Sequence, residues 1–357
     1  MSTGNKIKVL VVDDLDVVVM AVSRIINEQP DMYIYAAASD PYEAVKIISK
    51  NKPDVILLDI QMPRMDGLTF LRKLMSQHPL PVIMFSSVAE KGSANAIKAL
   101  QLGAVSILPK PKNIISNFDF HEELVAAVRN AYAVRDKVIK LVAGARSILK
   151  KETSDKEVEA KEKIVSVPSK KVIAIGASTG GTQALHYIFE HLPEDIPGIV
   201  IVQHMPGNFT RWFAESLNRN SSIRVEEARP GMVLKRGNAI IANGFYHMQL
   251  KMIKSKYVIF TNENAPVNRH RPSVDVLFDS VAECAGDQSV GILLTGMGDD
   301  GARGLLKMKQ AGAETIAQDE LSAVVFGMPR MAIAMRAANK VMNLNQIINF
   351  IKTFDTY

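Results

Sequence analysis

The sequence predicts two α/β domains, each built on a parallel β-sheet. In residues 7–140, short and almost entirely apolar runs alternate with amphipathic stretches of helical periodicity. Runs of this kind suit strands that are buried on both faces, as the strands of parallel sheets are. The alternation restarts at Lys171, after a highly charged stretch at 150–163. A chain of 357 residues is long enough for two or three domains of ordinary size.

The first domain contains five β-α units. Its apolar runs are IKVLVVDD, MYIYAAAS, PDVILLDI, PVIMFSS and VSILPKP, and helical patterns such as YEAVKIISK and GLTFLRKLMSQ lie between them. A last helical pattern extends from about Phe118 to about Lys140. Five such units predict an open, doubly wound sheet of five parallel strands with a flavodoxin-like fold. Sheets of this type collect their ligand chemistry at the carboxyl ends of the strands.

The second domain is expected to be an α/β parallel-sheet hydrolase domain with an antiparallel insertion. Its apolar runs include KVIAIGAS, GIVIVQHM, VGILLTGMGDDG and ETIAQDE. Between Met232 and Asn262, the pieces GNAIIANG, YHMQLKM and KYVIFTN follow one another without an obvious helix, which predicts the insertion. We expect the domains at 1–140 and 171–357, with a charged linker at 141–170 that buries little surface.

Composition excludes several classes of protein. The only cysteine is Cys284, so intrachain disulfides and cysteine-based zinc sites are ruled out. No signal peptide is recognisable, and no apolar run approaches the roughly 20 residues of a membrane helix. The net charge of +6 is spread along the chain without a basic block. We therefore expect a cytoplasmic, monomeric protein without membrane insertion or nucleic-acid binding.

Polar side chains stand at four of the five predicted strand ends of the first domain. Asp13 and Asp14 follow the first strand, Asp59 ends the third, Ser86 the fourth and Lys110 the fifth. Each by itself has a simpler explanation, because an aspartate at a strand end is commonly a helix cap. Together they predict an acidic cluster that suits Mg²⁺ and can receive a phosphoryl group, with the lysine paired to its oxygens.

The motifs VVDD, LLDIQMPRMDG, FSS and PKP resemble the receiver domain of two-component response regulators, over residues 7 to about 128. The resemblance implies that Asp59 is phosphorylated, with a histidine kinase as the phosphodonor. It also implies that Mg²⁺ is held by Asp13, Asp14, Asp59 and the backbone carbonyl of Gln61.

The same resemblance gives roles to the ends of the fourth and fifth strands. Ser86 takes the position of the switch hydroxyl, Lys110 contacts the phosphate, and a cis peptide bond precedes Pro111. The sequence departs from the family at Ile107, where many receivers carry an aromatic switch residue.

A second group of reactive residues begins with Ser178. The strand KVIAI continues into GASTGG, so Ser178 lies in a Gly-x-Ser-x-Gly setting, between Gly176 and Gly180. Small residues permit a tight strand-to-helix turn that exposes the hydroxyl, and the helix start offers N–H groups to an oxyanion. A phosphate-binding loop or a simple helix cap would explain the same motif.

A histidine and two carboxylates follow at other strand ends. His204 follows the run GIVIVQ and is a candidate general base, and Asp299 and Asp300 follow VGILLTG. Either carboxylate can orient the imidazole, although a structural histidine and a turn aspartate are the simpler interpretations. The chain order Ser…His…Asp differs from the Ser…Asp…His order of α/β-hydrolases.

The segments GASTGG, QHMP, HRPSVDVLF, LLTGMGDDGARG and AQDELSAVVFGMP resemble the chemotaxis protein-glutamate methylesterase (CheB) family, from about Lys171 to Asn343. The resemblance implies that Ser178 is the nucleophile, His204 the base and Asp300 the orienting carboxylate, because the family pattern is Gly-Met-Gly-x-Asp-Gly.

Further expectations follow from this family. The backbone N–H of Met297 is the implied oxyanion donor, and Thr179 lines the site. The implied substrates are methylated chemoreceptors, with deamidation of receptor glutamines as a second activity and no cofactor for the esterase step. Two alternatives stay open: a phospho-dependent binding protein without catalysis, and a DNA-binding regulator.

Overall fold

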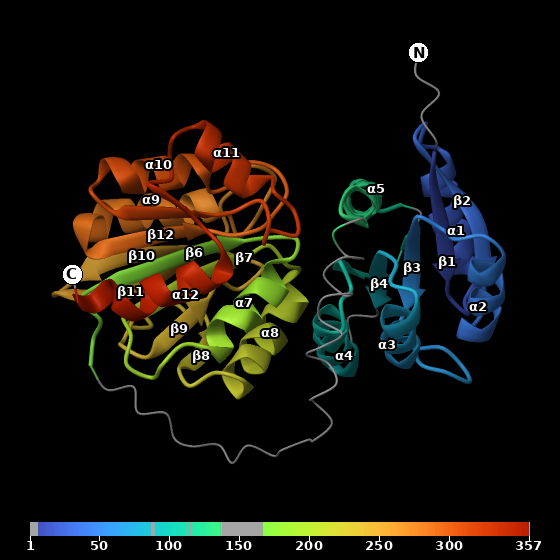
Figure 1. Cartoon of the computed structure of the whole chain (residues 1–357), viewed down its shortest axis with the longest axis horizontal. Helices are drawn as coiled ribbons and strands as arrows, with labels where there is room; N and C mark the ends of the chain where they lie inside the picture. Colours follow the sequence, from blue (N-terminus) through green and yellow to red (C-terminus); the bar gives the residue numbers. More distant parts are fainter. Residues whose placement is uncertain are drawn as a thin grey trace. The chain divides into compact units, whose positions relative to one another are not determined.

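The computed structural model describes residues 6–86, 90–111, 113–114, 116–135, 137 and 167–356. The chain divides into two compact units, 1–155 and 156–357 (Figure 1). The charged stretch 150–163 lies outside the described residues, so the linker and the predicted domain limits stay predictions. None of the described helices is long and apolar enough to cross a membrane.

The first unit is a five-stranded parallel sheet with the order β2-β1-β3-β4-β5. This confirms the predicted doubly wound fold. Two inner strands of the sheet, β1 and β3, are almost entirely buried, as strands covered on both faces are. Its elements are β1 (Ile7–Val12), α1 (Asp16–Asn27), β2 (Met32–Ala38), α2 (Pro41–Lys50), β3 (Val55–Asp59), α3 (Gly67–Gln77), β4 (Val82–Ser86), α4 (Glu90–Gln101), β5 (Ser106–Pro109) and α5 (Phe118–Ala133).

Side-chain caps define where several helices of this unit begin. The Asp40 carboxylate accepts from the N–H groups of Tyr42 and Glu43 at the start of α2. Asp66 caps α3 by accepting from the N–H of Thr69. Short polar side chains at this position satisfy N–H groups that the helix itself leaves unpaired. These caps fix the helix starts close to the strand ends that carry the polar cluster.

The second unit is built on a seven-stranded parallel sheet with the order β14-β13-β12-β6-β7-β9-β8. Its elements are β6 (Val172–Ala177), α7 (Gly181–Glu190), β7 (Gly198–Gln203), α8 (Gly207–Arg219), β8 (Arg224–Glu227), β9 (Asn238–Ile241), β10 (His247–Ile253), β11 (Lys256–Asn262), α9 (Val274–Ala285), η2 (Gly286–Gln288), β12 (Ser289–Leu293), α10 (Ala302–Gln310), β13 (Glu314–Gln318), α11 (Met328–Ala334), β14 (Lys340–Met342), α12 (Leu344–Thr353) and η3 (Phe354–Thr356).

The predicted antiparallel insertion is a two-stranded hairpin, because only two of the three expected pieces belong to it. β10 and β11 pair antiparallel, with His247 opposite Asn262. The first piece, GNAIIANG, instead supplies β9, which pairs parallel with both β7 and β8. All four residues of β9 are buried, which is what a strand inside a parallel sheet requires.

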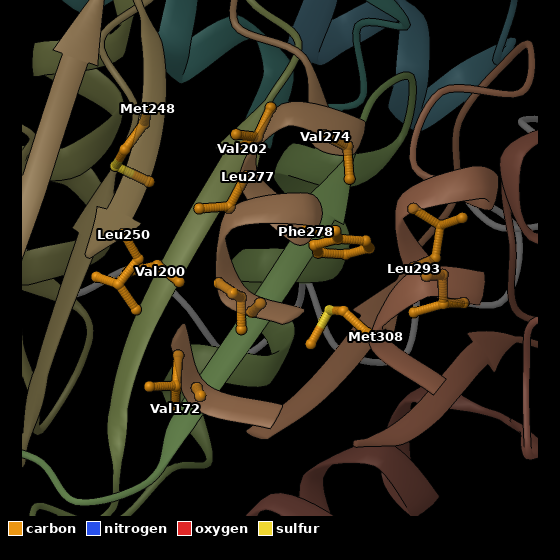
Figure 2. Close-up of a cluster of buried hydrophobic side chains, with 14 of the residues drawn as sticks. Val172, Val200, Val202, Met248, Leu250, Val274, Leu277, Phe278, Leu293 and Met308 are labelled. Carbon is orange, nitrogen blue, oxygen red and sulfur yellow. The ribbon is translucent and has the colours of Figure 1, made fainter. Parts of the chain in front are cut away.

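A hydrophobic core holds α9 against the sheet. Figure 2 shows its side chains coming from the central strands, from β10 and from α9. α9 contacts β10, β6 and α10, and the Ser280 hydroxyl on α9 accepts from the N–H of Leu250 on β10 (2.9 Å). Phe278 on α9 is fully buried in this core. The packing therefore fixes the position of α9, including its first turn beside the strand ends.

Replacing Phe278 with alanine should lower the free energy of unfolding by about 3–5 kcal/mol, since a buried aromatic ring is exchanged for a cavity. Trp212 on α8 is the only tryptophan, so its fluorescence during denaturant unfolding reports on the second unit. Leu321→Ala is the control, because this side chain is 93% exposed and its loss should cost less than about 0.5 kcal/mol. Equal costs for the two variants would contradict the core assignment.

Candidate active site

Ser178 lies in a tight loop between β6 and α7. Its N–H donates to the carbonyl of Thr295 (3.0 Å), and its own carbonyl accepts from the N–H of Gly181 (2.7 Å). Gly180 has a φ of 80°, in the left-handed region, and a Cβ there would lie 2.5 Å from Cβ of Val324. The small residues of GASTGG are thus required by backbone conformation and close packing.

The ends of β6 and β7 bring Ser178 and His204 to the same edge. Ala177 pairs with Gln203 in the sheet, and the N–H of His204 donates to the Ala177 carbonyl (3.0 Å). The Gln203 side-chain amide donates to the carbonyls of both Ser178 and His204, each at 3.0 Å. One buried amide therefore ties the two loops together.

His204 forms a buried pair with Asp300. The imidazole Nε2 is 2.8 Å from Oδ2 of Asp300, and the two side chains are 7% and 1% exposed. With a carboxylate as its partner, Nε2 must carry a hydrogen, so in the neutral imidazole the lone pair is on Nδ1. Nδ1 is buried and has no hydrogen-bond partner among the described residues. Buried polar atoms are rarely left unpaired, so Nδ1 is a candidate proton acceptor.

Asp300 accepts hydrogen bonds from the first turn of α9 and from the loop before it. The N–H of Val274 reaches Oδ2 (2.7 Å), while the Ser273 hydroxyl (2.7 Å) and the Asn268 amide (2.8 Å) reach Oδ1. Burial by itself would raise the pKa of Asp300, but the hydrogen bond and charge of His204, together with the other donors, hold it well below its ordinary value. Asp300 is therefore an anion at neutral pH, whereas its neighbour Asp299 is exposed.

The segment at 295–298 packs directly against the Ser178 loop. A Cβ on Gly296 would lie 2.7 Å from Cβ of Ser178, so the two backbones approach closely. The Thr295 hydroxyl donates to the Thr179 carbonyl (2.9 Å). Within the described part of the chain, the backbone N–H groups of Thr179 and Met297 have no acceptor. Neither N–H group is therefore committed to another group in this part of the chain.

Three residues of this site carried no role in the sequence-based interpretation. Asn268 and Ser273 bind Asp300, and the ring of His270 stacks on the ring of His204. His270 and Ser273 lie inside the HRPSVDVLF motif, which was matched only as a segment. The run of polar residues before the helix could have indicated that this segment belongs to a site. Its spacing, however, does not connect it to the Asp300 carboxylate about 30 residues later.

The first unit brings its predicted cluster together at the ends of β1, β3 and β5. The Lys110 ammonium lies 2.6 Å from Oδ2 of Asp13 and 2.9 Å from Oδ2 of Asp59. Oxygens of Asp13, Asp14 and Asp59 lie within 4.8 Å of one another. Burial raises the pKa of Asp59, with a further rise from Asp13, while Lys110 acts in the opposite direction.

This cluster fits a hard divalent cation. It combines three carboxylates with one ammonium, and the side chains of Asp13 and Asp59 that share this ammonium are buried. A cation supplies the positive charge that the lysine alone does not. Gln61 follows two residues after Asp59, in the loop to α3, where its carbonyl can join such a set.

The remaining predicted residues of the first unit lie at the ends of β4 and β5. Ser86 is buried at the end of β4, and Ile107 is buried in β5. The expectation of a cis bond before Pro111 is wrong: among the described residues, the cis peptide bond is the one between Arg271 and Pro272.

Comparisons with known proteins identify the family to which each unit is similar. The model of the CheB methylesterase family matches residues 173–351, and that of the response regulator receiver domain matches residues 9–118. A protein of Chromohalobacter salexigens named protein-glutamate methylesterase/protein-glutamine glutaminase is 47% identical over 347 residues, which cover 97% of this chain and 95% of that protein. A protein of Pseudomonas syringae pv. tomato named protein-glutamate methylesterase/protein-glutamine glutaminase 2 is 47% identical over 96% of this chain and 98% of its own.

Solved structures include the CheB methylesterase catalytic domain of Thermotoga maritima. That domain is 38% identical, with a TM-score of 0.51, and the match covers 53% of this chain and all of that one. The chain therefore belongs to the CheB methylesterase family and carries a response regulator receiver domain ahead of its methylesterase domain.

Proposed function

We propose that this chain hydrolyses the glutamyl methyl esters of chemoreceptors, and deamidates receptor glutamines by the same route, under the control of phosphorylation in chemotaxis. The observation that carries the proposal is the buried pair of His204 and Asp300 beside the Ser178 loop, with Nδ1 of His204 free to accept a proton. The names of the relatives support the substrate class, since both are protein-glutamate methylesterase/protein-glutamine glutaminases.

The proposed reaction is acyl transfer through Ser178. The Ser178 hydroxyl attacks the ester carbonyl and its proton passes to Nδ1 of His204, while Asp300 stabilises the imidazolium through Nε2. The free N–H of Met297 stabilises the developing oxyanion, and Thr179 lines the same position. Methanol leaves with the proton from His204. Water then attacks the acyl-enzyme by the same base and releases the glutamate, so no cofactor takes part in this step.

The two nitrogens of His204 have exchanged partners relative to the histidine of the serine-protease triad. There, the carboxylate binds Nδ1 and the serine faces Nε2. Here the carboxylate binds Nε2, so we assign the proton transfer to Nδ1. The chemistry is the same, because either nitrogen of a neutral imidazole can act as the base when the other carries the hydrogen.

Ser178→Ala should lower methanol release from methylated receptors by about 10⁴-fold or more, and Asp300→Asn should lower kcat by about 10³–10⁴-fold with little change in KM. A neutral amide in place of the Asp300 carboxylate would no longer stabilise the imidazolium as a charge does. Asp299→Asn is the matched control, because this neighbour is exposed and should retain wild-type rates. A Ser178→Ala protein with near-normal release would remove the assignment.

The receiver domain is the proposed switch. Asp59 accepts the phosphoryl group from a histidine kinase, Lys110 pairs with its oxygens, and Ser86 responds to it. Mg²⁺, when bound by Asp13, Asp14, Asp59 and the carbonyl of Gln61, neutralises charge between the carboxylates and the incoming phosphoryl group. Phosphorylation then shifts a pre-existing equilibrium from a less active to a more active form of the esterase. We place these reactions in the cytoplasm.

A small phosphodonor such as acetyl phosphate should raise methanol release by the wild type but not by Asp59→Asn, since only the wild type can form the acyl phosphate. Chelation of Mg²⁺ should remove the rise and leave the basal rate unchanged. Asp16→Asn, at an exposed carboxylate on α1, is the control and should respond as the wild type does.

A fragment beginning at Lys171 tests how the switch acts. It should exceed the rate of the unphosphorylated full chain, because the unphosphorylated receiver would no longer restrain it, and the relative solved as a catalytic domain alone supports its independent folding. Equal rates would remove inhibition by the receiver. Absence of release by every protein and condition would instead favour a phospho-dependent binding protein.

A further inference from the structure

His270 is placed beside the base by a tight two-residue turn. The backbones of Val267 and His270 exchange two hydrogen bonds, at 3.1 and 2.9 Å. The two residues between them, Asn268 and Arg269, have φ angles of 52° and 67°. Positive φ at both central positions is the geometry of a type I′ turn, which usually contains glycine or asparagine. An arginine in this conformation is uncommon, so the surrounding contacts must hold the turn in place.

The turn contacts both members of the buried pair. The imidazole of His270 stacks on that of His204, with ring centroids 3.8 Å apart and planes 13° apart. From the same turn, the Asn268 amide donates to Asp300 (2.8 Å) and to Asp275 (2.7 Å). A single short segment thus contacts the face of the base and the carboxylate that orients it.

The stacked ring is uncharged at neutral pH. Burial first, and then the charge of His204, lower the pKa of His270 to about 4, with a further lowering from Arg269 and an opposing effect from Asp300. The neutral face of an imidazole attracts a cation stacked on it, whereas a second cation would repel it. His204 becomes such a cation when it takes the proton of Ser178.

The face of the His204 ring is the part of the imidazole that a neighbouring side chain can contact without binding either nitrogen. Nε2 is held by Asp300, while Nδ1 has no hydrogen bond within the described residues and must stay available for the reaction. A contact through the ring face restricts rotation of the imidazole without occupying either nitrogen. The stacking distance and the small interplanar angle match that requirement.

We propose that His270 is a positioning residue, which holds the His204 ring with Nε2 on Asp300 and Nδ1 free, and which stabilises the imidazolium through its neutral face. This inference rests on the proposed role of His204 as the base. It predicts that a flat, neutral side chain at position 270 is sufficient, and that an added positive charge there is harmful.

The test measures kcat, KM and the pH dependence of methanol release by the full chain, with His270→Ala, His270→Phe and His270→Arg. His270→Ala should lose about tenfold in kcat with KM within about twofold, while His270→Phe should stay within about threefold of the wild type. His270→Arg keeps a planar group but adds a permanent charge. It should therefore move the acid limb of kcat/KM to lower pH by about one unit.

His191→Ala, at an exposed histidine after α7, is the control for loss of a ring elsewhere, and Ser178→Ala tests the underlying function in the same assay. Wild-type kcat in His270→Ala, with Ser178→Ala inactive, would overturn this inference and leave the proposed function intact. An active Ser178→Ala protein would overturn the proposed function instead. If His270→Ala fails to fold, identical pH profiles for His270→Phe and His270→Arg would overturn the inference.

Discussion

The catalytic unit depends on a single buried carboxylate, that of Asp300. Its two oxygens accept from one imidazole, one hydroxyl, one amide and the backbone at the start of α9. An isolated anion could not be buried at this depth, because its desolvation would exceed any single hydrogen bond. Several donors and the positive end of the α9 dipole together offset that cost.

This requirement links the hydrophobic core to the chemistry. The first turn of α9 can donate to Asp300 only if the helix is held in place, and the holding comes from apolar side chains such as Phe278 packed against the sheet (Figure 2). A substitution in the core beside α9 would therefore affect the site by displacing the backbone N–H groups of α9 that donate to Asp300. The residues of α9 therefore affect both the stability of the unit and the reactivity of the site, because this helix packs in the core and begins beside the Asp300 carboxylate.

The two units use the same architectural rule with opposite electrostatics. Both place their polar side chains at the carboxyl ends of parallel strands. In the receiver, burial raises the pKa of Asp59 beside other carboxylates, so the cluster favours added positive charge. In the methylesterase unit, many donors surround one carboxylate and keep it ionised. The first arrangement suits a metal and a phosphoryl group, and the second suits stabilisation of a transient imidazolium.

The sequence by itself determined the fold class and the positions of the reactive residues along the chain. Parallel strands end at one edge, so the apolar runs before Ser178, His204 and Asp300 were enough to predict that these residues lie close together. Their chemical roles, like the phosphorylation of Asp59, stay predictions that rest on that proximity and on the family.

Only the tertiary structure decided how the side chains meet. In the structure, Nε2 of His204 binds Asp300, and His270 stacks on the same ring. Asn268 donates to the Asp300 carboxylate, and β9 belongs to the parallel sheet and not to the insertion. The physical reason is that an apolar run identifies a strand that is buried on both faces. The residues that follow such a strand therefore lie at the edge of the sheet. Side-chain orientation across that edge depends on turns and helix positions set by packing between distant segments, and no local spacing encodes it.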